Sequence, residues 1–153
     1  MSRRVTANIH LDALRANLAR VRALTPGARV MAVVKADGYG HGLERVARAL
    51  AGADAFGVAS IADGERIRAI GLPNRIVVLS GIDEAGDLAA MRALALEPVL
   101  HHDSQLDLLA ADPDPSPLTV WLKLDTGMHR LGFAPERAAA MRGRSVGPST
   151  PML

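Results

Sequence analysis

The chain has 153 residues, of which 49% are hydrophobic and 22% charged, as expected for one folded domain. Its formal net charge is only +2, and without a basic stripe or base-stacking aromatics we expect no nucleic-acid binding. Cysteine is absent, which excludes disulfides and thiolate metal sites, and no apolar run reaches the length of about 18 residues of a membrane span. We therefore expect a cytoplasmic protein that does not enter a membrane.

The first predicted elements are a short strand at residues 5–9 and a helix after it. Leu14, Leu18 and Val21 recur at helical spacing and predict one buried stripe. Asp12 is a candidate N-cap for this helix, and a Pro-Gly pair at 26–27 marks the turn that follows.

Five short apolar runs follow, and their starts are separated by roughly 20 to 25 residues, which suits a strand, a helix and two loops. The runs lie at 30–34, 55–59, 76–79, 98–100 and 118–124. The segments between them have helical periodicity, clearest at Leu43, Val46, Ala47 and Leu50, and weaker at Leu88 and Met91 and at Leu106 and Leu109.

Repeated strand and helix units indicate an α/β fold with a parallel sheet. The runs are almost continuously apolar, so both faces of the sheet should be buried. Two architectures fit this pattern, a doubly wound open sheet and a (β/α)8 barrel of the TIM type. A barrel needs about 250 residues, so this chain would hold about five of its strand-helix units.

The last part of the chain changes character. Residues 135–142 have a helical pattern, whereas 143–153 are rich in glycine, proline and serine without apolar periodicity. We expect a partial barrel domain over 1–142 and a disordered or frameshifted tail over 143–153.

Lys35 stands out because only two of the 18 basic residues are lysine, the other being Lys123. Arginine can replace lysine as a surface charge, but it cannot form an imine with an aldehyde. Lys35 lies at the end of an apolar run, in the segment Val-Val-Lys-Ala-Asp-Gly-Tyr-Gly-His-Gly (33–42). Its glycines permit tight turns, and the hydroxyl of Tyr39 could hold a phosphate oxygen.

A second segment, Trp-Leu-Lys-Leu-Asp-Thr-Gly-Met-His-Arg-Leu-Gly-Phe (121–133), carries Lys123 and Arg130 after another apolar run. The two segments, in this order, resemble the two signatures of alanine racemases, which are fold-type III pyridoxal-phosphate enzymes with an N-terminal TIM-type barrel. The resemblance extends from about residue 5 to residue 137. It implies that the chain stops part-way round the barrel and that the family's C-terminal β-domain is absent.

The resemblance also implies site roles. Lys35 would carry pyridoxal 5'-phosphate as an imine and act as the base on one face of the substrate. Tyr39 would bind the phosphate. Lys123 matches a position that is carbamylated in many members, and Arg130 would lie near the cofactor's phenolic oxygen and the substrate carboxylate. Asp125, Met128 and His129 would position or shape this second loop.

Several of these residues have simpler interpretations. Tyr39 could cap a loop, His41 could be a helix-entry residue, and Lys123 could be a salt-bridge partner at a strand end. His101 and His102 are adjacent in a strand and would point to opposite faces, so we expect no metal site there. Asp103 is expected to precede or cap a helix.

The implied function is the interconversion of L- and D-alanine for peptidoglycan precursors, in a family of homodimers. Its second acid or base is a tyrosine of the β-domain, whereas Tyr39 is the single tyrosine here. We therefore expect an incomplete or inactive racemase. The alternatives are a non-catalytic pyridoxal-phosphate-binding barrel, a fragment that assembles with a missing half, and a related fold-type III decarboxylase.

Overall fold

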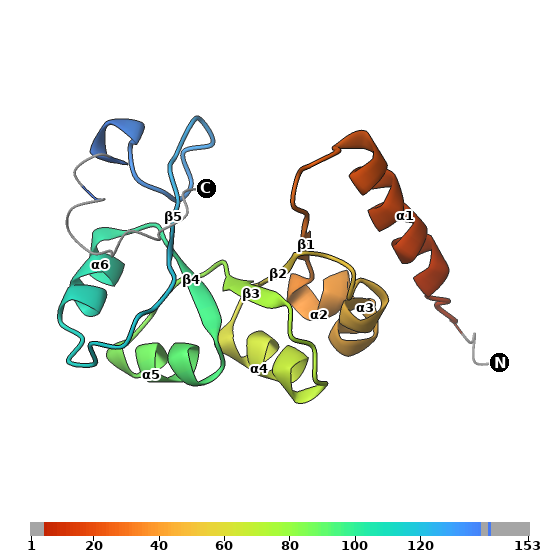
Figure 1. Cartoon of the computed structure of the whole chain (residues 1–153), viewed down its shortest axis with the longest axis horizontal. Coiled ribbons are helices and arrows are strands. Elements are labelled where there is room, and N and C mark those ends of the chain that lie inside the picture. Colours follow the sequence, from red (N-terminus) through yellow and green to blue (C-terminus); the bar gives the residue numbers. More distant parts are fainter. Residues whose placement is uncertain (1–4, 139–140, 142–153) are drawn as a thin grey trace.

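The computed structural model describes residues 5–138 and 141. Strands and helices alternate along the chain (Figure 1). The strands are β1 (Met31–Val33), β2 (Ala55–Val58), β3 (Arg75–Val78), β4 (Leu96–Leu100) and β5 (Trp121–Leu122). The helices are α1 (Leu11–Leu24), α2 (Lys35–Tyr39), α3 (Leu43–Ala49), α4 (Ile61–Ala69), α5 (Ala85–Ala93), α6 (Asp103–Ala110) and a 3-10 turn (Pro135–Arg137).

The five strands form one parallel sheet in the order β1-β2-β3-β4-β5. Strand order never reverses, and right-handed crossovers therefore place the helices on one side of the sheet. A doubly wound sheet would reverse its order and carry helices on both faces. Figure 1 shows α4, α5 and α6 along the same side of the strands, as in part of a (β/α) barrel.

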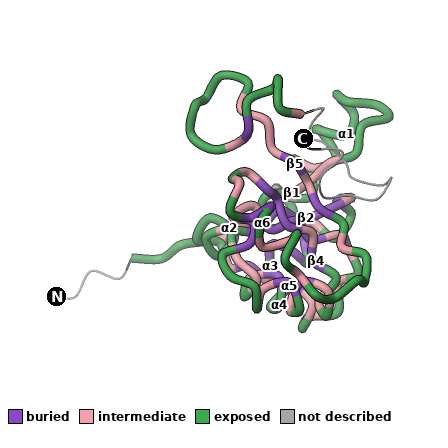
Figure 2. The backbone as a smooth tube through the Cα atoms, turned by 90° about the vertical axis from the view of Figure 1, so that its left-hand side faces the viewer, coloured by how far each residue is buried: buried purple, intermediate pink, exposed green. Residues whose placement is uncertain are grey.

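The hydrophobic core lies between the sheet and these helices, where the tube of Figure 2 is purple. Phe56, Ile76 and Leu122 point into it from the strands, and Leu43 and Ile67 from the helices, each fully buried. Alternate strand residues face the other side of the sheet. Burial on both faces is confirmed for β2, whereas Val33 of β1, which lies on the face away from the helices, is 40% exposed.

Three predictions near the start are wrong. Residues 5–9 form no strand, and Val5 is 96% exposed, because no strand among the described residues lies beside them. The predicted helix forms, but His10 rather than Asp12 is its N-cap; Asp12 lies in the first turn and pairs with Arg15. The predicted buried stripe of this helix is wrong as well, because no residue of α1 is buried and Val21 is 45% exposed.

The later elements follow the predicted runs with shifted ends. β4 begins at Leu96, before the predicted 98–100, and β5 has two residues inside the predicted 118–124. The helical pattern at 135–142 gives the 3-10 turn Pro135–Arg137; residues 139–140 and 142, and the predicted tail at 143–153, lie outside the described residues. Within the described chain, no helix has both the length and the apolarity to cross a membrane.

Candidate active site

The sheet brings Lys35 and Lys123 to the same edge. Lys35 follows β1 and Lys123 follows β5, and in a parallel sheet the carboxyl ends of all strands meet at one edge. Val34 is 1% exposed and packs in the helix-covered core, as does Leu122. The lysines next to them are therefore directed to the side of the sheet away from the helices.

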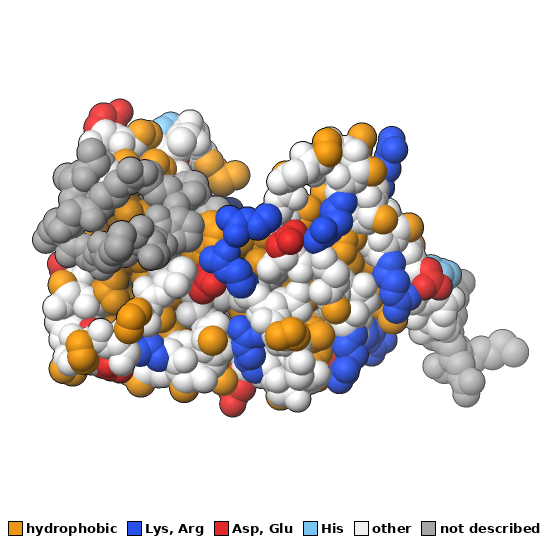
Figure 3. All heavy atoms as spheres, in the orientation of Figure 1, with side chains coloured by type: hydrophobic (Ala, Val, Ile, Leu, Met, Phe, Trp, Pro, Cys, Tyr) orange, Lys and Arg blue, Asp and Glu red, His pale blue; other side chains and the backbone are white. Residues whose placement is uncertain are grey.

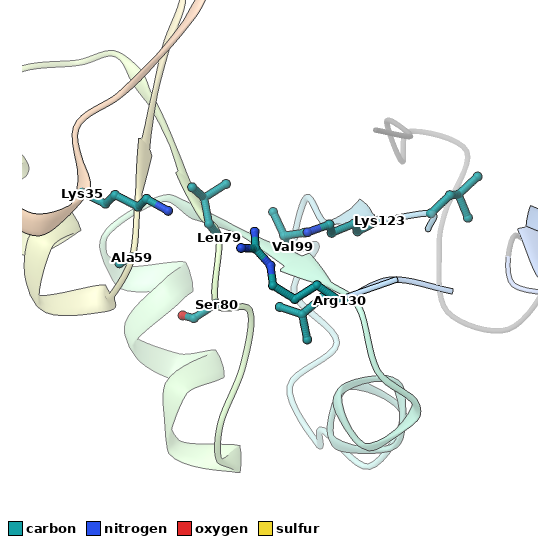
Figure 4. Close-up of a pocket in the computed structure, with 9 residues that line it drawn as sticks. Lys35, Ala59, Leu79, Ser80, Val99, Lys123 and Arg130 are labelled. Atoms are coloured by element: carbon teal, nitrogen blue, oxygen red, sulfur yellow. The ribbon is translucent and has the colours of Figure 1, made fainter. Parts of the chain in front are cut away.

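Both lysines and Arg130 line one cavity of about 500 Å³. Figure 4 shows the nitrogen-bearing ends of the three side chains pointing into a common space. The remaining wall is mostly apolar and is formed by Ala59, Leu79, Ser80, Val99, Leu124 and Leu131. In the orientation of Figure 1, Figure 3 shows that the molecule is hollowed between the part that carries α1 and the part that carries β5.

These three cations differ from several arginines elsewhere in the described chain. Arg66, Arg92 and Arg137, for example, all pair with carboxylates. Among the described residues, the side chains of Lys35, Lys123 and Arg130 have no ion-pair partner. Positive charges that converge on a concave site without counter-charges attract an anionic ligand.

The backbone after Lys35 forms a left-handed turn. Ala36, Asp37, Gly38 and Tyr39 have φ angles of 54°, 53°, 62° and 54°. For residues other than glycine this conformation costs about 1–2 kcal/mol each. Glycine is required at position 38 for two reasons. A Cβ would strain the left-handed backbone, and it would also lie 3.0 Å from Cγ2 of Val46. Strain of this kind persists only where the surrounding structure enforces it, which is common beside functional groups.

The turn separates Tyr39 from the cavity of Lys35. Tyr39 is 58% exposed and lines a smaller cavity of about 140 Å³, against Leu14 of α1 and Val46 of α3. The structure therefore brings Lys35, Lys123 and Arg130 together, but does not bring Tyr39 to them. His41 is a structural residue of the turn, since its Nδ1 lies 3.0 Å from both the Gly38 and the Tyr39 carbonyl oxygens and can donate to them.

Asp125 organises the loop that carries Arg130. Its carboxylate accepts hydrogen bonds from the backbone N–H groups of Gly127 (3.1 Å) and His129 (2.9 Å), and it also lies 3.0 Å from Nδ1 of His129. The hydrogen bonds from these two backbone groups lower the pKa of Asp125. A β-bridge between Leu124 and Phe133 closes the base of the loop. The contacts of Asp125 are those of a residue that positions this loop.

Sequence reasoning missed the wall of the cavity, which comes from the ends of the central strands. Ala59 directly follows β2, Leu79 and Ser80 follow β3, and Val99 belongs to β4. The rule that ligands bind at the carboxyl ends of parallel strands would have pointed to these positions.

The sequence predicted a strand at the histidine pair, but the pair follows β4 and is part of the loop framework. Nε2 of His101 lies 2.8 Å from the Ser80 carbonyl oxygen, which also accepts a hydrogen bond from the buried side chain of Gln105. His102 is the N-cap of α6 and Asp103 is its first residue, so the expectation that Asp103 precedes or caps this helix is wrong by one position. The described residues contain no group of three or more histidine or acidic side chains placed to hold a metal ion.

Comparison with known proteins identifies one family for this chain. The family model "Alanine racemase, N-terminal domain" matches residues 9–145. An alanine racemase of Halorhodospira halophila is 53% identical over 89% of this chain, and the match covers 38% of that protein. The chain therefore spans about two fifths of the length of such relatives.

Solved structures agree with this assignment. The crystal structure of the biosynthetic alanine racemase from Pseudomonas aeruginosa matches 93% of this chain with a TM-score of 0.83 at 40% identity, over 40% of that protein. The alanine racemase of Acinetobacter baumannii matches 86% of the chain with a TM-score of 0.79 at 34% identity. The fold is thus an incomplete (β/α) barrel, and the chain belongs to the family of alanine racemase N-terminal domains.

Proposed function

We propose that this chain forms the cofactor-holding part of a pyridoxal-phosphate-dependent alanine racemase, an isomerase. The observation that carries the proposal is the convergence of Lys35, Lys123 and Arg130, without counter-charges among the described residues, on one partly apolar cavity. A primary amine in such a place can condense with an aldehyde, which neither a guanidinium nor a buried apolar group can do.

The lining residues fit pyridoxal 5'-phosphate. The cations match its phosphate and a substrate carboxylate, and Leu79 and Val99 offer apolar walls for its ring. A volume of about 500 Å³ lies in the range of small-molecule pockets. When bound, the cofactor supplies an electron sink that stabilises the carbanion left after loss of the α-proton.

The chain's own residues would act around this group. Lys35 would hold the cofactor and exchange a proton at its Nζ with the substrate. Arg130 would hold an anionic oxygen of the cofactor or the substrate carboxylate through its planar set of donors. Carbamylation of Lys123 would turn a cation into an anion, which could then fix the guanidinium of Arg130 in the same cavity.

The chain offers Tyr39 as a phosphate ligand but no second tyrosine as a proton donor. Tyr39 remains our proposed phosphate ligand on the basis of its motif, four residues after Lys35, although it lines a different cavity. Tyr39 is also the single tyrosine of the chain. We therefore propose that the 153-residue chain alone holds cofactor but has negligible racemase activity, and that the full-length protein is a cytoplasmic homodimer that supplies D-alanine to peptidoglycan precursors.

Cofactor titration of the purified chain tests this proposal. Pyridoxal phosphate should produce a visible absorbance change with the native chain and with Lys123→Arg. Lys35→Arg, which keeps the charge but removes the amine, should abolish it. An unchanged response of Lys35→Arg would refute the assignment. Interconversion of L- and D-alanine by the chain alone at ordinary enzyme rates would refute the expected inactivity.

A further inference from the structure

We propose that Asp37, held by Arg66, is a positioning residue that fixes the direction of the Lys35 amine. This inference rests on the proposed function, because it concerns the approach of Lys35 to an aldehyde. Asp37 lies outside the cavity, so it would act through the backbone of the turn and not by touching the cofactor.

Asp37 ties the left-handed turn to the start of α3. Its carboxylate accepts a hydrogen bond of 3.0 Å from the backbone N–H of Leu43, and its own carbonyl oxygen accepts one of 2.8 Å from Gly42. Leu43 is fully buried and is the first residue of α3. The carboxylate therefore connects a strained turn to a fixed point of the core.

Arg66 completes the connection from α4. Its guanidinium donates to Asp37 (2.9 Å) and makes two hydrogen bonds, of 2.8 and 3.0 Å, to Glu44 of α3. The Leu43 backbone N–H and then the Arg66 guanidinium lower the pKa of Asp37, so this carboxylate is charged at neutral pH. One arginine thus joins the turn, α3 and α4.

Lys35 depends on this arrangement because, among the described residues, its amine has no partner that would orient it. Its backbone is held next to the turn instead. The N–H of Val34 donates to Gly57 of β2 (2.8 Å), and the carbonyl of Val34 accepts from Gly38 (2.9 Å), inside the turn. If the turn relaxed from its left-handed conformation, the bond from Gly38 would be lost and the side chain of Lys35 would change direction.

The amine content of the chain allows a direct measurement. Its primary amines are the N-terminus, Lys35 and Lys123. An amine condenses with the aldehyde of pyridoxal phosphate with loss of water, and borohydride then delivers hydride to the C=N bond and leaves a stable secondary amine. Peptide mass spectrometry after brief labelling gives the ratio of label at Lys35 to label at Lys123 in the same molecules.

We expect native protein to favour Lys35, and Asp37→Ala to lower the ratio by roughly tenfold or more, as misplacement of a reacting group does. Asp37→Asn keeps an oxygen for the Leu43 N–H and tolerates the left-handed conformation, so it should retain most of the preference. Glu44→Gln, the matched control, alters a partner of Arg66 outside the turn and should leave the ratio within about twofold.

Circular dichroism and thermal unfolding show whether each variant is folded. A folded Asp37→Ala protein with the native ratio would overturn the inference. If Asp37→Ala does not fold, Arg66→Gln on the exposed side of α4 is the test instead. A lower ratio of label at Lys35 to label at Lys123 than in Glu44→Gln supports the inference, and an equal ratio overturns it. A native protein without any preference for Lys35 would refute the proposed function itself.

Discussion

The Lys35 turn (residues 35–42) and the Arg130 loop (residues 125–133) both follow strands and both send a cation into one cavity, but they are held in different ways. The Lys35 turn is continuous with the core, since Val34, Gly38 and Leu43 are buried. The Arg130 loop reaches the core only at its end, through the buried Phe133; the rest is held by hydrogen bonds to Asp125, and its Met128 is 76% exposed.

This difference indicates a division of roles between the two segments. A residue that bonds covalently to a ligand needs a fixed backbone, whereas a residue that closes over the ligand from the rim can be carried by a locally organised loop. We therefore expect substitutions near Lys35 to affect the stability of the whole domain, and substitutions near Arg130 to affect mainly the loop.

The largest contrast should come from two leucine truncations. Leu43→Ala removes a fully buried side chain beneath the Lys35 turn and should lower the free energy of unfolding by about 2–5 kcal/mol. Leu131→Ala, in the Arg130 loop and 44% exposed, should change it by about 0.5 kcal/mol or less. Urea unfolding curves measure both, and similar losses would contradict the division.

Two glycine substitutions should separate the regions at the level of the backbone. Gly38→Ala imposes the left-handed conformation on a residue with a Cβ and crowds Val46, so it should lower global stability by about 1–2 kcal/mol or more. Gly132→Ala would place a Cβ 2.8 Å from the backbone nitrogen of Asp125 and should open the bridge at Phe133.

Hydrogen exchange distinguishes these two outcomes. Gly132→Ala should speed exchange of the Asp125 and Phe133 amides and leave those of β2 and β3 unchanged. Gly38→Ala should speed exchange throughout the sheet. Faster exchange of the central strands in Gly132→Ala would show that the Arg130 loop supports the core after all.

A smaller and local effect is expected for Asp125→Ala. It removes the acceptor of the Gly127 and His129 N–H groups, so the loop should lose order while the midpoint of unfolding changes little. Brief labelling of Lys35 with pyridoxal phosphate and borohydride should persist. Among the described residues, the hydrogen bonds of the Asp125 side chain all go to residues of its own loop, and none goes to the Lys35 turn. Loss of that labelling would argue for coupling between the two segments.

The smallest effect is the pH dependence. Hydrogen bonds lower the pKa of Asp37 in the folded state, so its contribution is complete above the ordinary value of 3.8 and is lost as the pH falls through the lowered value. Stability should therefore fall less steeply in Asp37→Asn than in the native chain in the interval below about pH 4. In this interval, Asp125→Asn should change the hydrogen exchange of the Arg130 loop more than it changes the midpoint of global unfolding. Equal slopes of stability against pH for the native chain and both variants would contradict this prediction.

The sequence alone determined the five strands of the sheet, apart from their exact ends, the order of the strand-helix units and the three cations. Apolar runs such as 76–79 are short and bounded by turns, and this pattern is local, so it predicts strands without knowledge of their neighbours. Lys35, Lys123 and Arg130 were identified because lysine is rare here and because two signatures are contiguous in the chain. The stripe of α1 was visible as well, but its burial was not, because burial depends on what packs against it.

Only the tertiary structure decided that these cations share one cavity, that Tyr39 faces another, and that the turn after Lys35 is left-handed. Local propensity disfavours that conformation at Ala36 and Asp37. It is adopted because a carboxylate on the turn meets the N-terminus of α3 and an arginine of α4, which are brought beside it by the packing of helices on the sheet. Contacts between distant segments of this kind leave no periodic pattern in the sequence, and for that reason the direction of the Lys35 amine is a property of the fold.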